Sequence, residues 1–364
     1  MKAAVMTEVG KPLEILDVDI DDPQSREVVV SVKASGLCHS DLHTLKTDFG
    51  WPVPLVLGHE AAGVVEEVGS LVTSVKVGDR VVGNLISSCG ECSRCRQGYP
   101  TMCSNPDAIR RPAGDRPRYS MNGETVTQIG DIGGFAEKIL VHERNVVKVD
   151  DAVPFDRAAL LGCGVITGIG AVKNVAKVQL GDTVAVIGCG GVGLNTVQGA
   201  ALAGARRIIA IDLQPTKLDL ARRFGATDVI NSGTEDDVVG RVREIASEGG
   251  VDHAFEVIGL EATAQLAVEL TRVGGGTYVI GKVKPGSGVQ LSADDLLRGH
   301  KKLKGLFMGY TIADLDIPLY ADLYQQGRLN LDDLVSETIS LDQINEGYEK
   351  LESGEIARSV VVFD

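Results

Sequence analysis

The C-terminal half of the chain alternates short apolar runs with longer amphipathic ones. The apolar runs are TVAVIG, RIIAID, TDVIN, HAFEVIG and TYVIG, at 183–188, 207–212, 227–231, 253–259 and 277–281. Between them lie helical patterns such as KLDLARRFGA, DVVGRVREIAS and ATAQLAVELTRV. Strands that alternate with helices of this length predict βα units and a doubly wound, parallel α/β sheet.

The first 150 or so residues have a different pattern, because short β-branched runs follow one another without intervening helices. EVVVSVKASG, AAGVVEEVGS and DRVVGN are the clearest of these runs, and glycine and aspartate separate them. The last part of the chain carries a helical pattern at IPLYADLYQQG and a strand pattern at SVVVF. We therefore expect a β-rich catalytic domain at 1–160, a nucleotide-binding domain at 161–305, and a segment at 306–364 that returns to the first domain.

One apolar stretch is long enough to resemble a membrane span, since 184–205 carries no charged residue. Its glycines and its polar Asn195, Thr196 and Gln198 suit a buried strand, turn and helix better than lipid. The net charge of −14 argues against nucleic acid and anionic membranes as partners. The first residues, MKAAVMTEVGKP, lack the apolar core of a signal peptide, and we expect a cytoplasmic protein.

A glycine-rich turn follows the strand at 183–188 and opens the next helical pattern. Its residues are Gly188, Gly190, Gly191, Val192 and Gly193. Such a turn lets the backbone approach a pyrophosphate, and the helix N-terminus offers free N–H groups and partial positive charge. Asp212 ends the next strand, where a carboxylate can bind the adenosine ribose and repel a 2′-phosphate. The pattern predicts NAD rather than NADP, with an ordinary strand–turn–helix connection as the alternative.

Four of the seven cysteines lie close together, at positions 89, 92, 95 and 103. Spacers of two residues allow the sulfurs of Cys89, Cys92, Cys95 and Cys103 to converge on one ion, as tetrahedral zinc requires. An iron–sulfur motif begins similarly, but it continues with a short spacer and Cys-Pro, whereas Ser104 follows Cys103 here. An odd cysteine total does not suit a disulfide framework. We expect a structural zinc in the loop 89–103, with four unrelated thiols as the alternative.

Three further stretches carry candidate metal ligands. CHSDLH contains Cys38, GHEAAGVVEEVG contains His59, and GCGVITG contains Cys163. A single cysteine or histidine is more often a packing residue than a ligand. Together with the four-cysteine loop, GCGGVG and Asp212, however, these stretches occur in the order and at the distances typical of one family. Over essentially its whole length, the chain resembles the zinc-containing medium-chain alcohol dehydrogenases.

This resemblance implies a GroES-like catalytic domain, a Rossmann coenzyme domain, bound NAD and two zinc ions per chain. Cys38, His59 and Cys163 would bind the catalytic zinc and leave a fourth position open. Asp41 would hydrogen-bond the ligand histidine, and Glu60 would lie behind the metal. Zinc makes the proton of a bound hydroxyl more acidic, and hydride transfer to NAD would leave an aldehyde or ketone.

The resemblance also implies roles for residues that the motifs alone leave ambiguous. Ser40 and His43 would pass the hydroxyl proton to solvent by way of the nicotinamide ribose; a helix cap and a solvated imidazole are the alternatives. Arg358 would contact the pyrophosphate and Lys217 a ribose, although either could be a solvated surface charge. His39 stands where related enzymes often carry an arginine on the pyrophosphate, so we expect weaker NADH binding and faster release.

The expected reaction is the interconversion of a primary or secondary alcohol and its aldehyde or ketone. A formaldehyde dehydrogenase that acts on a glutathione or mycothiol adduct shares the same motifs and remains open. A zinc-stabilised, NAD-binding protein without turnover is a more remote alternative. The resemblance further implies a homodimer or homotetramer. The loop 104–134 carries Arg110, Arg111, Arg116 and Arg118, which could attract an anionic substrate or simply be solvated.

Overall fold

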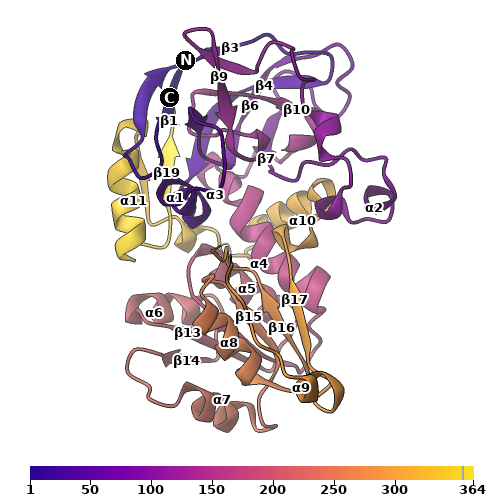
Figure 1. Cartoon of the computed structure of the whole chain (residues 1–364), viewed down its shortest axis with the longest axis vertical. Helices are drawn as coiled ribbons and strands as arrows, with labels where there is room; N and C mark the ends of the chain where they lie inside the picture. Colours follow the sequence, from indigo (N-terminus) through magenta and orange to yellow (C-terminus); the bar gives the residue numbers. More distant parts are fainter. Residues whose placement is uncertain (285, 355) are drawn as a thin grey trace. The chain divides into compact units, whose positions relative to one another are not determined.

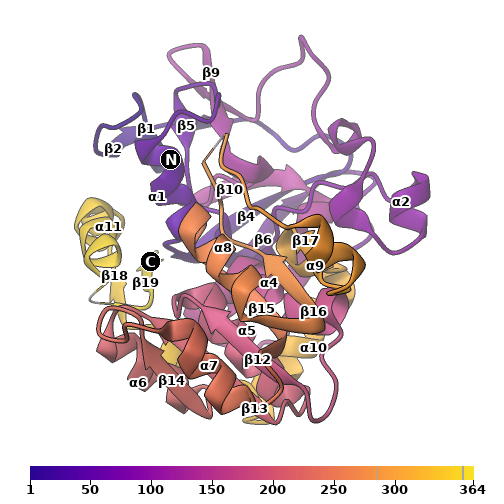
Figure 2. The ribbon, with the colours of Figure 1, turned by 60° about the horizontal axis from the view of Figure 1, so that its bottom comes forward.

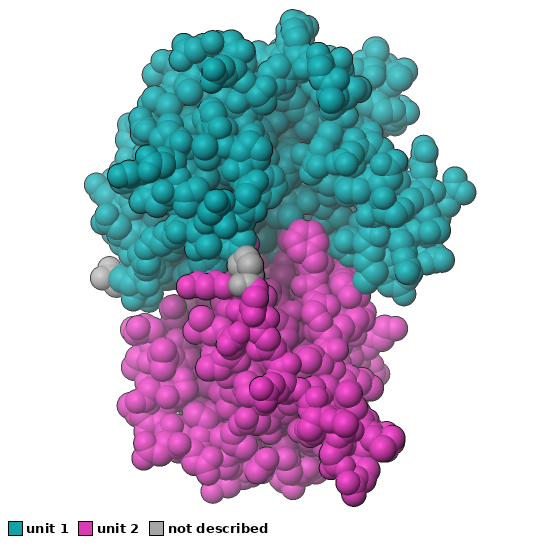
Figure 3. All heavy atoms as spheres, in the orientation of Figure 1, with its two compact units in different colours: residues 1–163, 312–364 teal, residues 164–311 magenta. Residues whose placement is uncertain are grey.

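The chain divides into two compact units, which Figure 3 shows in different colours. The computed structural model describes residues 1–284, 286–354 and 356–364. Unit 1 comprises Met1–Cys163 and Ile312–Asp364, and unit 2 comprises Gly164–Thr311. The C-terminal residues from Ile312 onward thus fold in the same unit as the N-terminal part of the chain.

Unit 1 is built on two sheets whose strands pair mostly in antiparallel fashion (Figure 1). One sheet has the order β2-β1-β5-β9-β8-β3. Its strands are β1 Lys2–Met6, β2 Glu14–Asp17, β3 Asp19–Ile20, β5 Leu55–Val56, β8 Tyr119–Met121 and β9 Glu124–Gln128. The other has the order β11-β7-β6-β4-β19-β18, and β10 also pairs with β4. Its strands are β4 Glu27–Gly36, β6 Glu60–Val68, β7 Arg80–Gly83, β10 Lys138–His142, β11 Val146–Lys148, β18 Glu337–Ile339 and β19 Ser359–Val362.

The β-branched runs of the N-terminal part form these strands as expected. The run EVVVSVKASG is β4, and AAGVVEEVGS and DRVVGN contain most of β6 and β7. The α-helices of unit 1 range from 4 to 13 residues in length. They are α1 His39–Lys46, α2 Ser93–Arg96, α3 Phe155–Leu160, α10 Ala313–Gln325 and α11 Ile344–Ser353. Figures 1 and 2 both show α11 beside β19, which the helix contacts.

Unit 2 is a six-stranded sheet in which all neighbouring strands are parallel, in the order β14-β13-β12-β15-β16-β17. The strands are β12 Thr183–Ile187, β13 Arg207–Asp212, β14 Asp228–Asn231, β15 Val251–Glu256, β16 Thr271–Val279 and β17 Lys302–Gly305. The helices are α4 Ile166–Gly170, α5 Gly191–Leu202, α6 Pro215–Arg223, α7 Val238–Ala246, α8 Glu261–Leu270 and α9 Ala293–Leu297. The predicted α/β class, with a Rossmann-like sheet, is confirmed.

One strand of this sheet did not stand out in the sequence. The edge strand β17 has the sequence KLKG and is exposed along its whole length. Edge strands often carry lysine, which discourages pairing with other chains, so the apolar signal of a buried strand is absent. The pattern therefore predicted five strands where the structure has six.

The uncharged run 184–205 forms most of β12 and α5, both largely buried, as expected. Among the described residues, a different helical stretch, Phe155–Ala176, is long and apolar enough to cross a bilayer. In its most apolar window, 83% of the residues are buried inside the protein. Because core helices commonly have this composition, the stretch is weak evidence for a membrane span.

Candidate active site and zinc-binding loop

Cys38, His59 and Cys163 come together inside unit 1, although they are far apart in the sequence. Their ligand atoms, together with a carboxylate oxygen of Glu60, all lie within 4.8 Å of one another, and all four residues are buried. Two thiols and one imidazole are donors that zinc prefers, and its bond lengths place tetrahedral ligands about 3.3–3.8 Å apart. The residues therefore fit a zinc ion, and three protein donors leave one coordination position for a substrate.

Strand pairing brings two of these ligands together. Gly36, the last residue of β4, pairs with Glu60, the first residue of β6. Cys38 follows Gly36 by two residues, and His59 directly precedes Glu60, so the two side chains meet at this end of the sheet. The register of β4 and β6 therefore sets the distance between the Cys38 thiol and the His59 ring.

Local backbone features fix the orientation of each ligand. Cys38 is the N-cap of α1, where the partial positive charge of the helix end favours a thiolate. Gly58 has φ +87°, and a Cβ atom there would lie 2.7 Å from the backbone nitrogen of Phe135, so only glycine fits before His59. Cys163 lies in a π-helical stretch, Leu161–Val165, a rare geometry that is frequent at functional sites.

The expected contact between Asp41 and His59 is present. Nδ1 of His59 lies 2.9 Å from Oδ1 of Asp41, and the backbone N–H of Gly58 donates to the same oxygen over 3.2 Å. Asp41 is 1% exposed. A carboxylate at Nδ1 keeps the proton there and turns Nε2 toward a metal as an acceptor.

The fourth residue of the cluster, Glu60, belongs to a buried ion pair. Oε1 of Glu60 is 3.2 Å from Nη2 of Arg358, and the Arg358 guanidinium also donates to the carbonyl oxygen of Leu37 over 2.6 Å. Burial raises the pKa of Glu60 to about 7, although the positive charge of Arg358 opposes this shift. Burial lowers the pKa of Arg358, but the charges of Glu60 and Cys38 outweigh it and raise the pKa overall. The pyrophosphate contact expected of Arg358 remains a prediction, and a solvated surface charge is wrong, because Arg358 is 3% exposed.

The two cysteines of the cluster differ in the direction in which their thiol pKa is shifted. A hydrogen bond with Cys163, supported by the charges of Arg358 and His59, holds the pKa of Cys38 well below its ordinary value despite burial. The same hydrogen bond and burial raise the pKa of Cys163. Cys38 is therefore the sulfur that the surroundings favour as a thiolate, and thiolates are the form that binds metal.

The four-cysteine loop also has the geometry of a metal site. The Sγ atoms of Cys89, Cys92, Cys95 and Cys103 lie within 4.8 Å of one another. Separations of 3.5 Å for Cys89–Cys103 and 3.9 Å for Cys92–Cys103 are far too long for a disulfide and close to the roughly 3.8 Å expected around tetrahedral zinc. Backbone N–H groups of Glu91 and Cys92 point at the Cys89 sulfur. The four sulfurs would fill all four coordination positions of a tetrahedral zinc ion, as in a structural zinc site.

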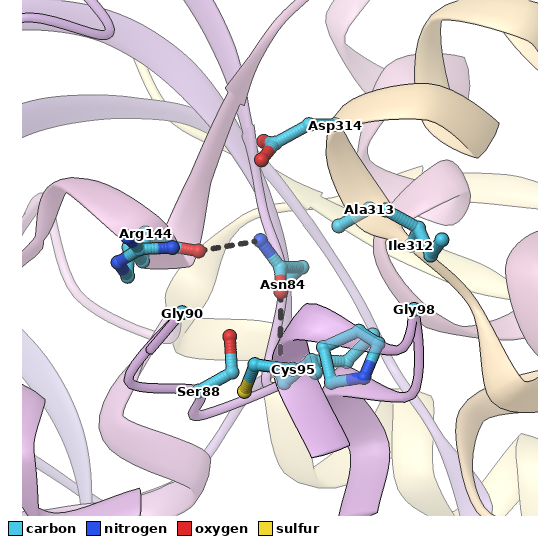
Figure 4. A pocket seen from close by; sticks show the side chains of 11 residues that line it. Asn84, Ser88, Gly90, Cys95, Gly98, Arg144, Ile312, Ala313 and Asp314 are labelled. Atoms are coloured by element: carbon cyan, nitrogen blue, oxygen red, sulfur yellow. Dashed lines mark hydrogen bonds between the residues drawn. The ribbon is translucent and has the colours of Figure 1, made fainter. Parts of the chain in front are cut away.

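A cavity of about 180 Å³ lies beside this loop (Figure 4). Arg144, Asn84, Ser88 and Asp314 supply its polar lining, and Cys95 reaches its wall. The Arg144 guanidinium packs on Gly90 of the loop, where a Cβ atom would lie 2.2 Å from Nη2. The side chain of Asn84 donates to the carbonyl oxygen of Arg144 over 3.3 Å. The cavity thus separates the cysteine loop from the start of α10.

The glycine turn of unit 2 has the geometry of a dinucleotide loop. Gly188 has φ +98°, and α5 begins at Gly191. A Cβ atom on Gly193 would lie 1.8 Å from the carbonyl oxygen of Gly188, so this glycine is needed for close helix–strand packing. Asp212 ends β13, and its carboxylate accepts hydrogen bonds from the backbone of Cys189 (2.8 Å) and Gln214 (2.9 Å). Cys189, within this turn, is fully buried.

The remaining predicted site residues lie on two helices. His39, Ser40 and His43 are all on α1 and are partly buried, and the rings of His39 and His43 are 6.5 Å apart. Lys217 is on α6, just beyond Asp212, and is also partly buried. Their roles toward a cofactor or substrate remain predictions.

The arginine-bearing loop differs from what we expected. The side chains of Arg111 and Arg118 are only 7% and 8% exposed and pair with Glu27 at the start of β4, at 2.6 and 2.7 Å. Arg110 pairs with Asp131 and Asp107, whereas the Arg116 side chain is 77% exposed. A solvated loop is therefore wrong for Arg111 and Arg118, and their charges are already neutralised. Glu27 lies more than 80 residues away in the sequence, so local patterns could not indicate this pairing.

Comparison with known proteins agrees with this geometry. Residues 24–151 match the family model for the alcohol dehydrogenase GroES-like domain, and residues 191–325 match that of the zinc-binding dehydrogenases. An S-(hydroxymethyl)glutathione dehydrogenase from Escherichia coli O139:H28 (strain E24377A / ETEC) is 42% identical over 99% of both chains.

Solved structures are similar over the whole chain. An alcohol dehydrogenase zinc-binding domain protein from Burkholderia ambifaria is 36% identical, with a TM-score of 0.94 over 100% of this chain and 98% of that one. Benzyl alcohol dehydrogenase from Acinetobacter calcoaceticus is 34% identical, with a TM-score of 0.92 over 100% of this chain and 99% of that one. Two matching domains, full-length relatives and the converging metal ligands give one result: the chain belongs to the family of zinc-containing medium-chain alcohol dehydrogenases.

Proposed function

We propose that the protein is an NAD-dependent alcohol dehydrogenase with one catalytic and one structural zinc. The observation that carries this proposal is the buried convergence of Cys38, His59 and Cys163 within one unit. Three metal-binding side chains brought together from separate elements have no comparable role in core packing, where apolar side chains suffice. This separates the proposal from a zinc-stabilised protein without turnover, which needs only the four-cysteine loop.

In this site each residue has a defined task. Cys38, His59 and Cys163 would hold the zinc, which, when bound, makes the hydroxyl of an alcohol more acidic. Asp41 keeps the His59 ring in one tautomer through the 2.9 Å hydrogen bond at Nδ1. With zinc bound, Cys38 and Cys163 would both be thiolates, and the nearby Arg358 guanidinium would offset part of their negative charge.

Ser40 and His43 would move the proton that the substrate loses. They are three residues apart on α1, so their side chains lie on neighbouring positions of one helix face. The helix begins directly after the proposed ligand Cys38, so Ser40 would lie close to the metal site and His43 one turn further along the helix. A histidine suits the outer end of such a relay, because imidazole exchanges protons near neutral pH.

Asp212 would select NAD over NADP, and replacing it should change the preference. Asp212→Ala should lower kcat/KM for NAD about 10- to 100-fold, because charge-assisted hydrogen bonds to the ribose contribute roughly 1.5–3 kcal/mol. The ratio of NADP to NAD efficiency should rise. Asp219→Ala removes an exposed carboxylate from the same region and should leave both values unchanged. An unaltered cofactor preference in the Asp212 variant would remove this assignment.

His39 would lie against the cofactor pyrophosphate, and an arginine there should bind it more tightly. His39→Arg should lower the dissociation constant of NADH about 3- to 10-fold, because a guanidinium can donate two parallel hydrogen bonds to phosphate. Fluorescence titration gives the affinity, and stopped-flow displacement should show slower NADH release. If affinity does not rise, His39 does not contact the pyrophosphate.

The substrate is either a free alcohol or the hydroxymethyl adduct of a thiol. The similarity to an S-(hydroxymethyl)glutathione dehydrogenase supports the adduct, and the similarity to benzyl alcohol dehydrogenase supports a free alcohol. The arginines of the loop 104–134 give glutathione little support, since Arg110, Arg111 and Arg118 are paired with carboxylates. We retain alcohol oxidation as the first proposal.

Nicotinamide reduction with a substrate panel separates these possibilities. Aliphatic and aromatic alcohols are compared with formaldehyde alone, formaldehyde plus glutathione, and formaldehyde plus mycothiol. We expect turnover of free alcohols. An enzyme that responds only to formaldehyde together with one thiol is instead the adduct dehydrogenase. No turnover of any alcohol, although both zinc ions are bound, would contradict both proposals.

A homodimer or homotetramer also remains a proposal. The described part of the unit 2 sheet ends at β17, next to the exposed side chains of Leu297 and Phe307. Leu297 is 77% exposed and Phe307 is 52% exposed. An edge strand flanked by exposed apolar side chains supports contact with a second copy of the chain.

A further inference from the structure

A carboxylate oxygen and a hydroxyl are buried without a partner near His59. Oδ1 of Asp41 accepts from His59 and Gly58, but Oδ2 has no hydrogen-bond partner among the described residues. The hydroxyl of Tyr348, on α11, is likewise buried and unpartnered within the described part of the chain. Tyr348 is 3% exposed. Nothing in the catalytic assignment above uses this hydroxyl.

A chain of contacts links the two residues. Gly58 donates to Asp41, and the ring of Phe135 packs directly on Gly58, where a Cβ atom would lie 2.8 Å from a ring carbon. The same ring meets Tyr348 edge to face, with centroids 6.2 Å apart and planes at 80°. Helices α1, which carries Asp41, and α11, which carries Tyr348, are also in contact. Figure 1 shows the two helices beside each other.

The two unpartnered groups are chemically complementary. An ionised carboxylate only accepts hydrogen bonds, whereas a phenol can donate one. Burial, together with the negative charges of Asp41 and Cys38, raises the pKa of Tyr348 well above its ordinary value, so the hydroxyl keeps its proton. Leaving both groups unpaired in a buried site is unfavourable, because each has lost its hydrogen bonds to water without gaining a partner. Buried waters commonly bridge such groups when direct contact is not made.

We propose that Tyr348 is a positioning residue whose hydroxyl donates to a buried water that in turn donates to Oδ2 of Asp41, and thereby fixes the carboxylate that orients His59. This inference rests on the proposed catalytic zinc site. Glu60 also has unpartnered oxygens, but Arg358 already lies 3.2 Å from its Oε1. In the described part of the chain no cation lies at Oδ2 of Asp41, so this carboxylate has the greater need of a donor.

Zinc retention tests the proposal without depending on turnover. Release of zinc from the purified holoenzyme to a chromogenic chelator is followed over time. The release phase of the catalytic zinc is identified as the one that is missing from Cys38→Ala. Tyr348→Phe should speed this phase about 3- to 10-fold. This is less than the loss of metal affinity, about 10- to 100-fold, that is typical when a side chain in direct contact with a metal-binding residue is replaced. Tyr119→Phe is the matched control, because it removes another buried hydroxyl of unit 1, which donates to the carbonyl oxygen of Lys138. It should leave zinc release unchanged.

A double-mutant cycle with Asp41→Asn shows whether Tyr348 acts through Asp41. In the Asp41→Asn background, Tyr348→Phe should change the release rate less than 2-fold. A full effect in that background, or equal effects of Tyr348→Phe and Tyr119→Phe, would overturn the proposal. If Asp41→Asn does not retain the second zinc, the comparison of the two tyrosine variants decides. A wild-type chain with only one zinc would instead count against the proposed function itself.

Discussion

Replacement of Cys38 by alanine should reduce kcat/KM for any alcohol substrate by at least about 10³-fold, or roughly 4 kcal/mol of transition-state stabilisation. Cys38 is the buried sulfur that the hydrogen bond with Cys163 and the charges of Arg358 and His59 favour as a thiolate. Without it, two protein ligands remain, which is fewer than catalytic zinc sites normally have. Steady-state nicotinamide reduction, with the protein quantified by absorbance, measures the loss.

The control for this variant is Cys189→Ala. Cys189 is also a fully buried cysteine, but it lies in unit 2 and belongs to neither of the two candidate metal-binding groups found among the described residues. This variant should keep its full zinc content. Circular dichroism should show that Cys38→Ala remains folded, since the side chain removed is small. Turnover of Cys38→Ala within 10-fold of the wild type would rule out Cys38 as a ligand of the catalytic metal.

Replacement of Cys103 by alanine should have its largest effect on stability rather than on chemistry. The Cys103 sulfur is within 3.9 Å of two other cysteine sulfurs of the loop, so its loss opens the site. We expect zinc to leave this loop and the melting temperature to fall by about 10 °C, because structural zinc binding contributes directly to folding free energy. Differential scanning calorimetry measures the shift.

Limited proteolysis locates this effect. The loop 89–103 has few buried residues of its own, so without zinc it should become a preferred cleavage site. Arg94 and Arg96 are exposed there and suit trypsin. If the Cys103 variant keeps both its melting temperature and its resistance to trypsin, the four cysteines do not hold a structural metal.

The sequence predicted most strands of unit 2 and, in unit 1, β4, β6, β7 and β19, because their apolar runs are regular and separated by glycine and aspartate. The spacing of its four cysteines also indicated the metal-binding loop, whereas the catalytic ligands Cys38, His59 and Cys163 followed from the resemblance. The contact between Asp41 and His59 followed from the resemblance. The edge strand β17 was missed, because its sequence KLKG carries charge where a buried strand would be apolar.

Contacts between distant parts of the chain were beyond prediction from local patterns. Arg111 and Arg118 pair with Glu27, and Arg358 pairs with Glu60, across separations of more than 80 residues. The pairing of Arg358 with Glu60 is set by the register of β4 with β6 and β19, since Gly36 of β4 pairs with both Glu60 and Val360. The position of the Tyr348 hydroxyl likewise depends on a long-range contact, the packing of α11 against α1.

Zinc content tests the central claim most directly, because the claim is that Cys38, His59 and Cys163 form a metal site distinct from the cysteine loop. Metal analysis of the purified wild type, Cys38→Ala and Cys103→Ala gives the number of zinc ions per chain. We predict two for the wild type and one for each variant, with the ion lost from a different site in each case. One zinc in the wild type and an unchanged content in Cys38→Ala would contradict the account.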